Sequence, residues 1–183
     1  MSLLRKDLLR GRRIALAGTP EEALRTALVD LGADVEPLLL TELGEDEERV
    51  GEWARAHLPL HALVYCAGPV FGTGGEEALN TTLDRAWAAV REVAVGALIE
   101  AEHPGKVVLI APGAGDGPLA EAAAAGLENL ARTLSVEWAR YQVTAVMVAP
   151  GATPEAQLAT LVAFLVSEAG EYLSGCRVEL GAR

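Results

Sequence analysis

The chain has 183 residues, of which 51% are apolar, and this is enough to build one domain with a sizeable core. We therefore expect a single domain over residues 1–183, with residues 1–11 as an N-terminal extension. A net charge of −11 opposes general affinity for nucleic acid or for an anionic membrane, so we expect neither as a partner.

The N-terminus is basic but is not typical of a signal peptide. Arg and Lys gather between Arg5 and Arg13, and the apolar run that follows covers only residues 14–17. That run is much too short for the apolar region of a signal peptide, and no run approaches the ~20 residues of a membrane span. We expect the basic cluster to be a solvated terminus and the protein to be cytoplasmic.

The first half of the chain opens with a strand–helix–strand unit. The sequence predicts a strand over residues 12–17, a tight turn at 18–20, a helix over 21–31 that Gly32 ends, and a strand over 35–40. Such a unit is the usual start of a dinucleotide-binding fold.

The glycine-rich turn that holds a diphosphate is nevertheless incomplete. Only Gly18 is present, and Glu21 and Glu22 place negative charge where the diphosphate of a dinucleotide would lie. Repulsion there should cost on the order of 1 kcal/mol or more per charge. An ordinary helix start, with acidic residues at the positive end of the helix dipole, is the better interpretation.

The middle of the chain continues the alternation of helices and strands. We expect a helix over residues 45–57, a strand over 62–65, a loop over 69–75 and a helix over 83–100. The loop contains three glycines, and we interpret it as a rim loop rather than a phosphate-binding loop.

The stretch from Gly105 to Gly151 predicts the centre of the sheet. Residues 106–110 and 143–148 have the β-branched, apolar composition of strands buried on both faces, and residues 119–140 carry leucines at helical spacing. A turn over 111–118 links the first strand to the helix, so the unit is a parallel crossover. After Pro150 and Gly151 a last helix is expected over 155–167, followed by a final strand.

Together these elements predict an α/β fold of three layers. We expect a doubly wound, Rossmann-like parallel sheet of about six strands, in the order 2-1-3-4-5-6, with helices on both faces.

Neither the cysteines nor the histidines predict a metal site. Cys66 and Cys176 fall in strands or at strand ends, and we interpret them as reduced, buried side chains. His57 and His61 are four residues apart, but Pro59 between them breaks the helix that a two-histidine site would need.

Several segments resemble the short-chain dehydrogenases and reductases. The sequence AGLENLARTLSVE, followed by VTAVMVAPG, is similar to the active-site helix and next strand of that family, and the tail FLVSEAGEYLSGCRVEL is similar to its final helix, turn and strand. Cys66-Ala67-Gly68 resembles the family's N-N-A-G motif. The resemblance is strong over residues 105–151 and 158–180 and weak before Leu40.

The resemblance implies that the catalytic side chains are missing. In the family the helix carries a Tyr and, four residues later, a Lys, and a Ser follows the preceding strand. Counting back from Glu137 without a gap, these positions hold Ala120, Ala124 and Pro112. Losing the acid–base group alone should cost roughly 100- to 10,000-fold in rate, so we expect no catalytic residues. Glu121 or Asp116 remains a possible replacement.

The resemblance also predicts how the chain binds and assembles. The family's cofactor cleft would survive as a vestige, and we expect no cofactor, or NAD or NADP if the protein is active. In the family, the helices that match residues 83–100 and 119–140 pair across a dimer interface. We therefore expect a homodimer, a homotetramer, or a hetero-oligomer with an active short-chain dehydrogenase. The residues of the vestigial cleft are Gly18, Thr19, Cys66, Ala67, Gly68, Pro150 and Gly151.

Three functions are consistent with this sequence. The first is a catalytically inactive short-chain dehydrogenase-like protein, a pseudoenzyme that serves as a scaffold or partner subunit. The second is an NAD(P)-dependent oxidoreductase with a shifted active site. The third is a small-molecule sensor that uses the vestigial cleft, which would lie at a topological switch point of the sheet.

Overall fold

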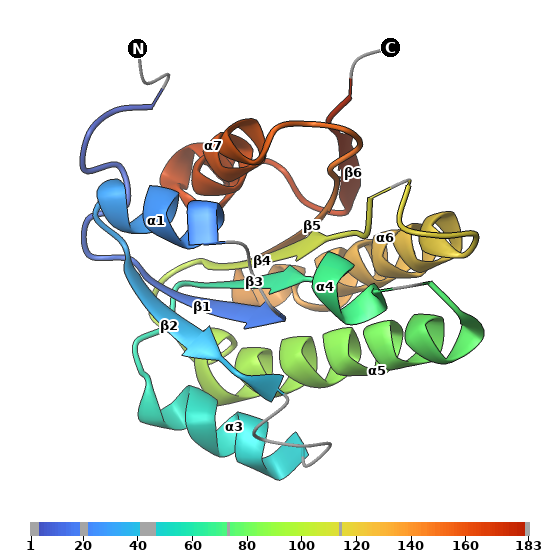
Figure 1. The fold of residues 1–183 in the computed structure, drawn as a ribbon. Coiled ribbons are helices and arrows are strands. Elements are labelled where there is room, and N and C mark those ends of the chain that lie inside the picture. Colours follow the sequence, from blue (N-terminus) through green and yellow to red (C-terminus); the bar gives the residue numbers. More distant parts are fainter. Residues whose placement is uncertain (1–3, 19–21, 41–46, 73, 114, 182–183) are drawn as a thin grey trace.

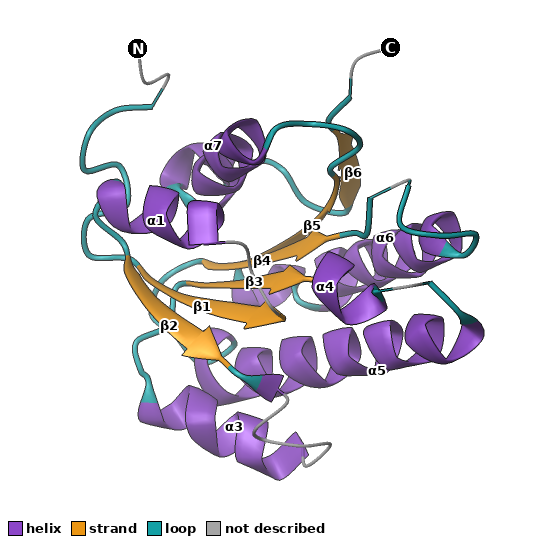
Figure 2. Cartoon of the chain, viewed as in Figure 1, coloured by secondary structure: helices purple, strands orange, loops and turns teal. Residues whose placement is uncertain are grey.

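A six-stranded parallel sheet forms the centre of the protein (Figures 1 and 2). The computed structural model describes residues 4–18, 22–40, 47–72, 74–113 and 115–181. The strand order is β2-β1-β3-β4-β5-β6, as the sequence predicts. The strands are β1 (Arg13–Gly18), β2 (Asp34–Leu38), β3 (Ala62–Cys66), β4 (Gly105–Ile110), β5 (Val143–Ala149) and β6 (Cys176–Glu179).

Helices cover both faces of the sheet and give the predicted three layers (Figure 1). One face carries α1 (Glu22–Asp30) and α7 (Glu155–Val166). The opposite face carries α3 (Glu47–Ala56), α5 (Glu76–Val93) and α6 (Ala120–Glu137). The shorter helices are α4 (Gly68–Phe71), the π-helical turn η1 (Ala94–Leu98), and the 3₁₀ turns η2 (Ala139–Tyr141) and η3 (Glu168–Gly170).

Two predicted element boundaries are wrong. The predicted loop over residues 69–75 contains α4, and the helix predicted to begin at Leu83 begins at Glu76. Glu76 and Glu77 lie in the first turn of α5, where the helix dipole favours carboxylates. This turn is largely exposed and therefore lacks the apolar periodicity that marks the rest of the helix.

The central strands are buried on both faces, which explains their continuous apolar sequences. In β3, Leu63 and Tyr65 face α5 and α6, whereas Val64 and Cys66 face α1 and α7. The buried Tyr65 hydroxyl donates a hydrogen bond of 3.1 Å to the carbonyl oxygen of Thr82 in α5, and burial raises the pKa of this Tyr65 hydroxyl.

The N-terminal segment, whose basic cluster the sequence predicts to be solvated, is anchored to the domain at one apolar residue. Leu9 is fully buried, and its backbone N–H donates to the carbonyl oxygen of Leu31 at 2.9 Å. Arg5, Lys6 and Arg10 remain exposed around this anchor. The burial of Leu9 could not be predicted from the sequence, because a single leucine among several basic residues forms no apolar pattern.

Within the described part of the chain neither cysteine forms a disulfide; Cys66 is buried and Cys176 is partly exposed. Among the described residues, no helix is both long and apolar enough to cross a membrane.

Gly18 is required by the packing of the sheet itself. Its φ is +77°, and a Cβ added there would lie 2.1 Å from the carbonyl oxygen of Cys66 on the neighbouring strand β3. Gly68, by contrast, has no atom nearer than 3.9 Å to such a Cβ, the nearest being Oδ2 of Asp116.

We predict that Gly18→Ala lowers the free energy of unfolding by about 1–3 kcal/mol or more, because it combines a strained backbone with a clash against backbone. Gly68→Ala is the matched control and should change that free energy by no more than about 0.5 kcal/mol. Urea denaturation of both variants measures this. Equal effects of the two substitutions would contradict the packing role of Gly18.

His61 forms a pH-sensitive contact at the amino-terminal edge of the sheet. Its Nδ1 accepts a hydrogen bond of 3.1 Å from the backbone N–H of Arg13, and its ring stacks on His103 with centroids 4.1 Å apart. Burial, followed by the nearby charges of His103 and Arg12, lowers the pKa of His61 to about 4.

We predict that the free energy of unfolding falls between pH 6.5 and pH 4, in part because of His61. The folded-state pKa lies below the unfolded value of about 6.5, so the unfolded chain binds more protons in this window. His61→Asn keeps an acceptor near Nδ1 but cannot titrate, and it should give a shallower pH dependence in denaturation experiments. Parallel pH profiles for the two proteins would show that His61 does not contribute.

Candidate functional site

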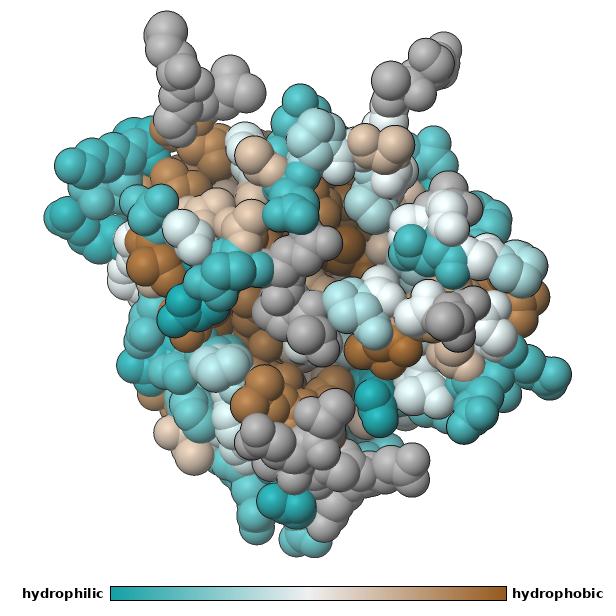
Figure 3. All heavy atoms as spheres, in the orientation of Figure 1, coloured by the Kyte–Doolittle hydropathy of each residue, from teal (hydrophilic) through white to brown (hydrophobic). Residues whose placement is uncertain are grey.

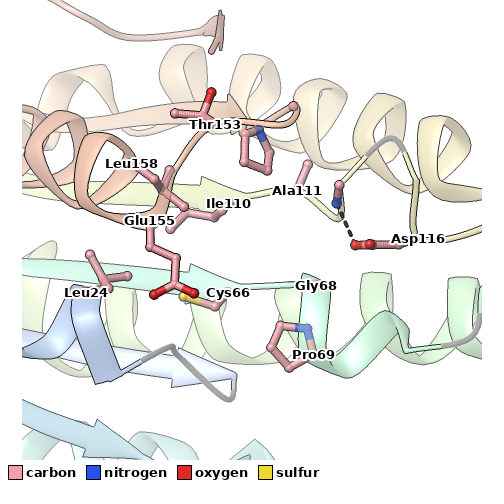
Figure 4. A pocket seen from close by; sticks show the side chains of 13 residues that line it. Leu24, Cys66, Gly68, Pro69, Ile110, Ala111, Asp116, Thr153, Glu155 and Leu158 are labelled. Atoms are coloured by element: carbon pink, nitrogen blue, oxygen red, sulfur yellow. Dashed lines mark hydrogen bonds between the residues drawn. The ribbon is translucent and has the colours of Figure 1, made fainter. Parts of the chain in front are cut away.

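A pocket of about 230 Å³ opens at the carboxyl ends of the central strands (Figure 4). This edge is where open parallel sheets bind their ligands. The pocket is lined by Leu24, Cys66, Gly68, Pro69, Ile110, Ala111, Gly113, Asp116, Pro150, Gly151, Thr153, Glu155 and Leu158.

Apolar side chains from both layers form much of the wall of the pocket. Cys66 ends β3 and Ile110 ends β4, so the pocket lies directly beyond the sheet. Leu24 of α1 and Leu158 of α7 contribute from the helices that cover this face. The pocket therefore lies toward α1 and α7, away from α5 and α6.

The charged side chains of the pocket are both acidic. Asp116 accepts a hydrogen bond of 2.7 Å from the backbone N–H of Gly113, which fixes the loop after β4. Glu155 begins α7, and Figure 4 shows its side chain extending toward Cys66. The described lining residues include no Lys or Arg. The pocket therefore has a negative rim over an apolar wall.

The structure brings together part of the predicted vestigial cleft. Cys66, Gly68, Pro150 and Gly151 line the pocket. Gly18 and Ala67 are not among its lining residues, and Gly18 instead packs against the carbonyl of Cys66. The predicted cleft residue Thr19 and the predicted repulsive residue Glu21 lie outside the described residues.

The predicted catalytic positions do not line the pocket. Pro112 is buried, and Ala120 and Ala124 are 2% and 3% exposed. Ala120 belongs to a small cluster with Ala123 and the fully buried ring of Phe71. That ring comes from α4 and fills the space beside the first turn of α6, so Ala120 faces packed protein.

Sequence analysis missed both Phe71 and Glu155. Phe71 falls in the stretch interpreted as a rim loop, although Pro69 directly after a strand, followed by Val70 and Phe71, indicates a short packed turn. Glu155 is an ordinary acidic residue at a helix start, and no sequence signal distinguishes it from one that faces solvent.

The two predicted replacement residues have different places in the structure. Asp116 lines the pocket. Glu121 lies outside its lining and forms an ion pair of 2.8 Å with Arg177 on β6. The hydrogen bond that Arg177 donates to Glu121 is the main reason that the pKa of Arg177 is raised. Of these two carboxylates, only that of Asp116 lies where it could act on a ligand in the pocket.

The described lining of the pocket does not favour an anionic ligand such as a nicotinamide dinucleotide. Its two charged side chains, Asp116 and Glu155, are both acidic and would repel a diphosphate placed near them. The volume of about 230 Å³ is also below the roughly 300–1,000 Å³ of small-molecule pockets. Within the described part of the chain, no group of three His, Cys, Asp or Glu side chains is placed to hold a metal ion.

Known proteins resemble this chain in structure rather than in sequence. No protein-family profile and no curated protein matches it. The citronellol catabolism dehydrogenase AtuB of Pseudomonas aeruginosa is 24% identical, with a TM-score of 0.76, and the match covers 98% of this chain and 97% of AtuB.

Two further solved structures have the same relationship. A short-chain dehydrogenase from Mycobacterium smegmatis is 20% identical, with a TM-score of 0.76, and the match covers 100% of this chain and 97% of that one. A double mutant of a Serratia marcescens short-chain dehydrogenase/reductase is 18% identical, with a TM-score of 0.75 and coverage of 94% and 96%. The chain therefore has the short-chain dehydrogenase/reductase fold over nearly its whole length.

Proposed function

We propose that this protein is a non-catalytic member of the short-chain dehydrogenase/reductase fold that serves as a scaffold or partner subunit. Ala120, at the position that the resemblance assigns to the proton-donating Tyr, is 2% exposed and packs with Phe71. This contact is the main support for the proposal. The buried Cys66 and the partly exposed Cys176, which form no disulfide in the described structure, are consistent with a reducing, cytoplasmic setting.

Three features oppose dehydrogenase chemistry. A methyl group at Ala120 can neither donate nor accept a proton, and the loss of a general acid–base group costs roughly 100- to 10,000-fold. The Phe71 ring also occupies the space beside that methyl group, so a substrate carbonyl has no path to it. The acidic pocket adds a third difficulty, because the hydride donor carries a diphosphate.

The outer faces of α5 and α6 are suited to assembly with another subunit. Trp87 on α5 is 42% exposed, Val95 on the adjoining turn η1 is 57% exposed, and Val136 on α6 is 78% exposed. Ala122 and Ala125 also face outward on α6, where small side chains allow close helix packing. We propose that these faces form a homodimer or homotetramer, or a mixed oligomer with an active short-chain dehydrogenase.

Asp116 supports a second candidate function. It is an acidic side chain at the mouth of an apolar pocket, at the edge where this fold binds ligands. A protein that binds a small molecule there as a sensor, or that uses Asp116 as a shifted acid or base, would need this carboxylate.

We predict that the purified protein oxidises neither NADH nor NADPH above background with a broad panel of aldehydes and ketones. Absorbance at the nicotinamide band measures this, with an active short-chain dehydrogenase as the positive control. Calorimetry with the four nicotinamide nucleotides should give no measurable heat. Turnover that Asp116→Asn abolishes would overturn the proposal in favour of a shifted active site.

We predict that Val136→Glu dissociates the oligomer, because it places a charge in the proposed interface. Val29→Glu is the matched control, since Val29 is an exposed valine on α1, on the other face of the sheet. Sedimentation velocity should show a smaller species only for Val136→Glu. A monomeric wild-type protein, or equal dissociation by both variants, would contradict the proposed interface.

A further inference from the structure

A second cavity lies at the opposite edge of the sheet and has the opposite charge. Its volume is about 380 Å³, and we call it the basic pocket. Figure 3 shows hydrophilic side chains along the left edge of the view, where the N-terminal segment lies. The basic pocket is lined by Arg5, Lys6, Asp7, Leu8, Arg10, Arg12 and Glu168.

The backbone that carries these side chains is held in consecutive turns. The N–H of Leu8 donates to the carbonyl of Arg5, that of Arg10 to Asp7 and that of Arg12 to Leu9, at 3.2, 3.1 and 2.9 Å. Leu9 is fully buried between these turns. The cations are therefore presented by a docked segment, and a ligand would need to order fewer backbone groups than on a free tail.

The lining carries more positive charge than its own carboxylates neutralise. Arg10 pairs with Asp7 at 3.1 Å, and Arg12 pairs with Glu168 at 2.9 Å. Arg5 and Lys6 have no ion-pair partner within the described residues. Four cations and two carboxylates leave a net charge of +2 in a protein whose total is −11.

The Arg12 pair is arranged so that an incoming anion can compete for the guanidinium. The side chain of Arg12 is only 16% exposed and is thus held in place, whereas that of Glu168 is 81% exposed. An exposed carboxylate gives little net stability to such a pair. An oxygen atom of a ligand could therefore displace the Glu168 carboxylate from the Arg12 guanidinium.

Lys106 is a buried residue close to Arg12 and Glu168. It lies on β4 with 2% exposure, and its Nζ is buried without a hydrogen-bond partner in the described structure. Burial lowers the pKa of Lys106, Arg12 lowers it further, and Glu171 and Glu168 oppose these effects. The same Arg12 and Glu168 line the basic pocket, so Lys106 lies close behind its wall.

We propose that the basic pocket binds the phosphate group of a small phosphorylated molecule. One guanidinium group can donate two parallel hydrogen bonds to phosphate oxygens, and three of the four cations are Arg. The net charge of +2 matches a phosphate dianion. The size of the pocket accommodates a small body beside the phosphate, and the overall charge of −11 disfavours an extended polyanion.

Calorimetric titration of the full chain with inorganic pyrophosphate tests this site. We expect a dissociation constant of about 1 mM or tighter at low salt and weaker binding at higher salt. The double variant Arg5→Gln/Lys6→Gln should bind at least about tenfold more weakly, and it removes exposed side chains that the fold does not need. Arg132→Gln on α6, which removes one positive charge elsewhere, should bind like the wild type.

A second pair of variants tests the direction of the effect. Glu168→Gln removes the carboxylate that competes for Arg12 and should tighten pyrophosphate binding severalfold. Glu77→Gln, at the start of α5 near the other edge of the sheet, removes the same charge and should have no such effect.

Three results would overturn the proposal. The first is no binding of phosphate or pyrophosphate at low salt. The second is equal weakening by the Arg5/Lys6 and Arg132 variants, which would show that only total charge matters. The third is binding to vesicles that contain phosphatidylserine, lost in the Arg5/Lys6 variant, without binding of pyrophosphate, which would identify a membrane contact instead.

Discussion

A parallel sheet must be packed against helices on both faces, and in this protein alanine side chains form much of that packing surface on α5 and α6. The inner faces of α5 and α6 bury a series of methyl groups, which let the helices approach the strands and one another closely. Gly126 of α6 illustrates how close this packing is, because a Cβ there would lie 2.7 Å from the side chain of Leu83 on α5. Ala120 and Ala124 belong to this covering surface, so the positions that the resemblance assigns to catalysis are occupied by packing residues.

The two edges of the sheet have opposite electrostatic character. At the carboxyl edge, Asp116 and Glu155 give the pocket a negative rim. At the amino edge, the segment before β1 concentrates positive charge around Arg12, with Lys106 buried behind it. The two carboxylates at the carboxyl edge would repel an anionic group of a ligand that bound close to them.

The fold could be predicted from the sequence because several strands carry the same apolar pattern. The apolar runs of β3, β4 and β5 have no solvent-facing alternation, and this property alone indicates a doubly covered parallel sheet. The start of α5 could not be predicted, since it opens with two exposed glutamates and has no apolar side chain between Leu79 and Leu83.

The site was predictable only in part, for physical reasons. Glycines and prolines at strand ends mark the carboxyl edge, and four of the predicted cleft residues do line the pocket. The packing of Phe71 against Ala120 depends on contacts between residues about fifty positions apart, which a single sequence does not report. The same holds for Glu155, whose direction is set by how α7 lies on the sheet.

Phe71 also constrains how this protein could change over evolution. A larger side chain at position 120 would have to enter the buried cluster that Ala120 forms with Ala123 and Phe71 of α4, which disfavours it unless that cluster repacks. Removing the ring first would leave an unfilled void under α4, and such voids typically cost 3–5 kcal/mol for a deleted Phe. Enlarging residue 120 and removing the Phe71 ring are thus each disfavoured as a single substitution. A return to a larger side chain at position 120 would need both changes together.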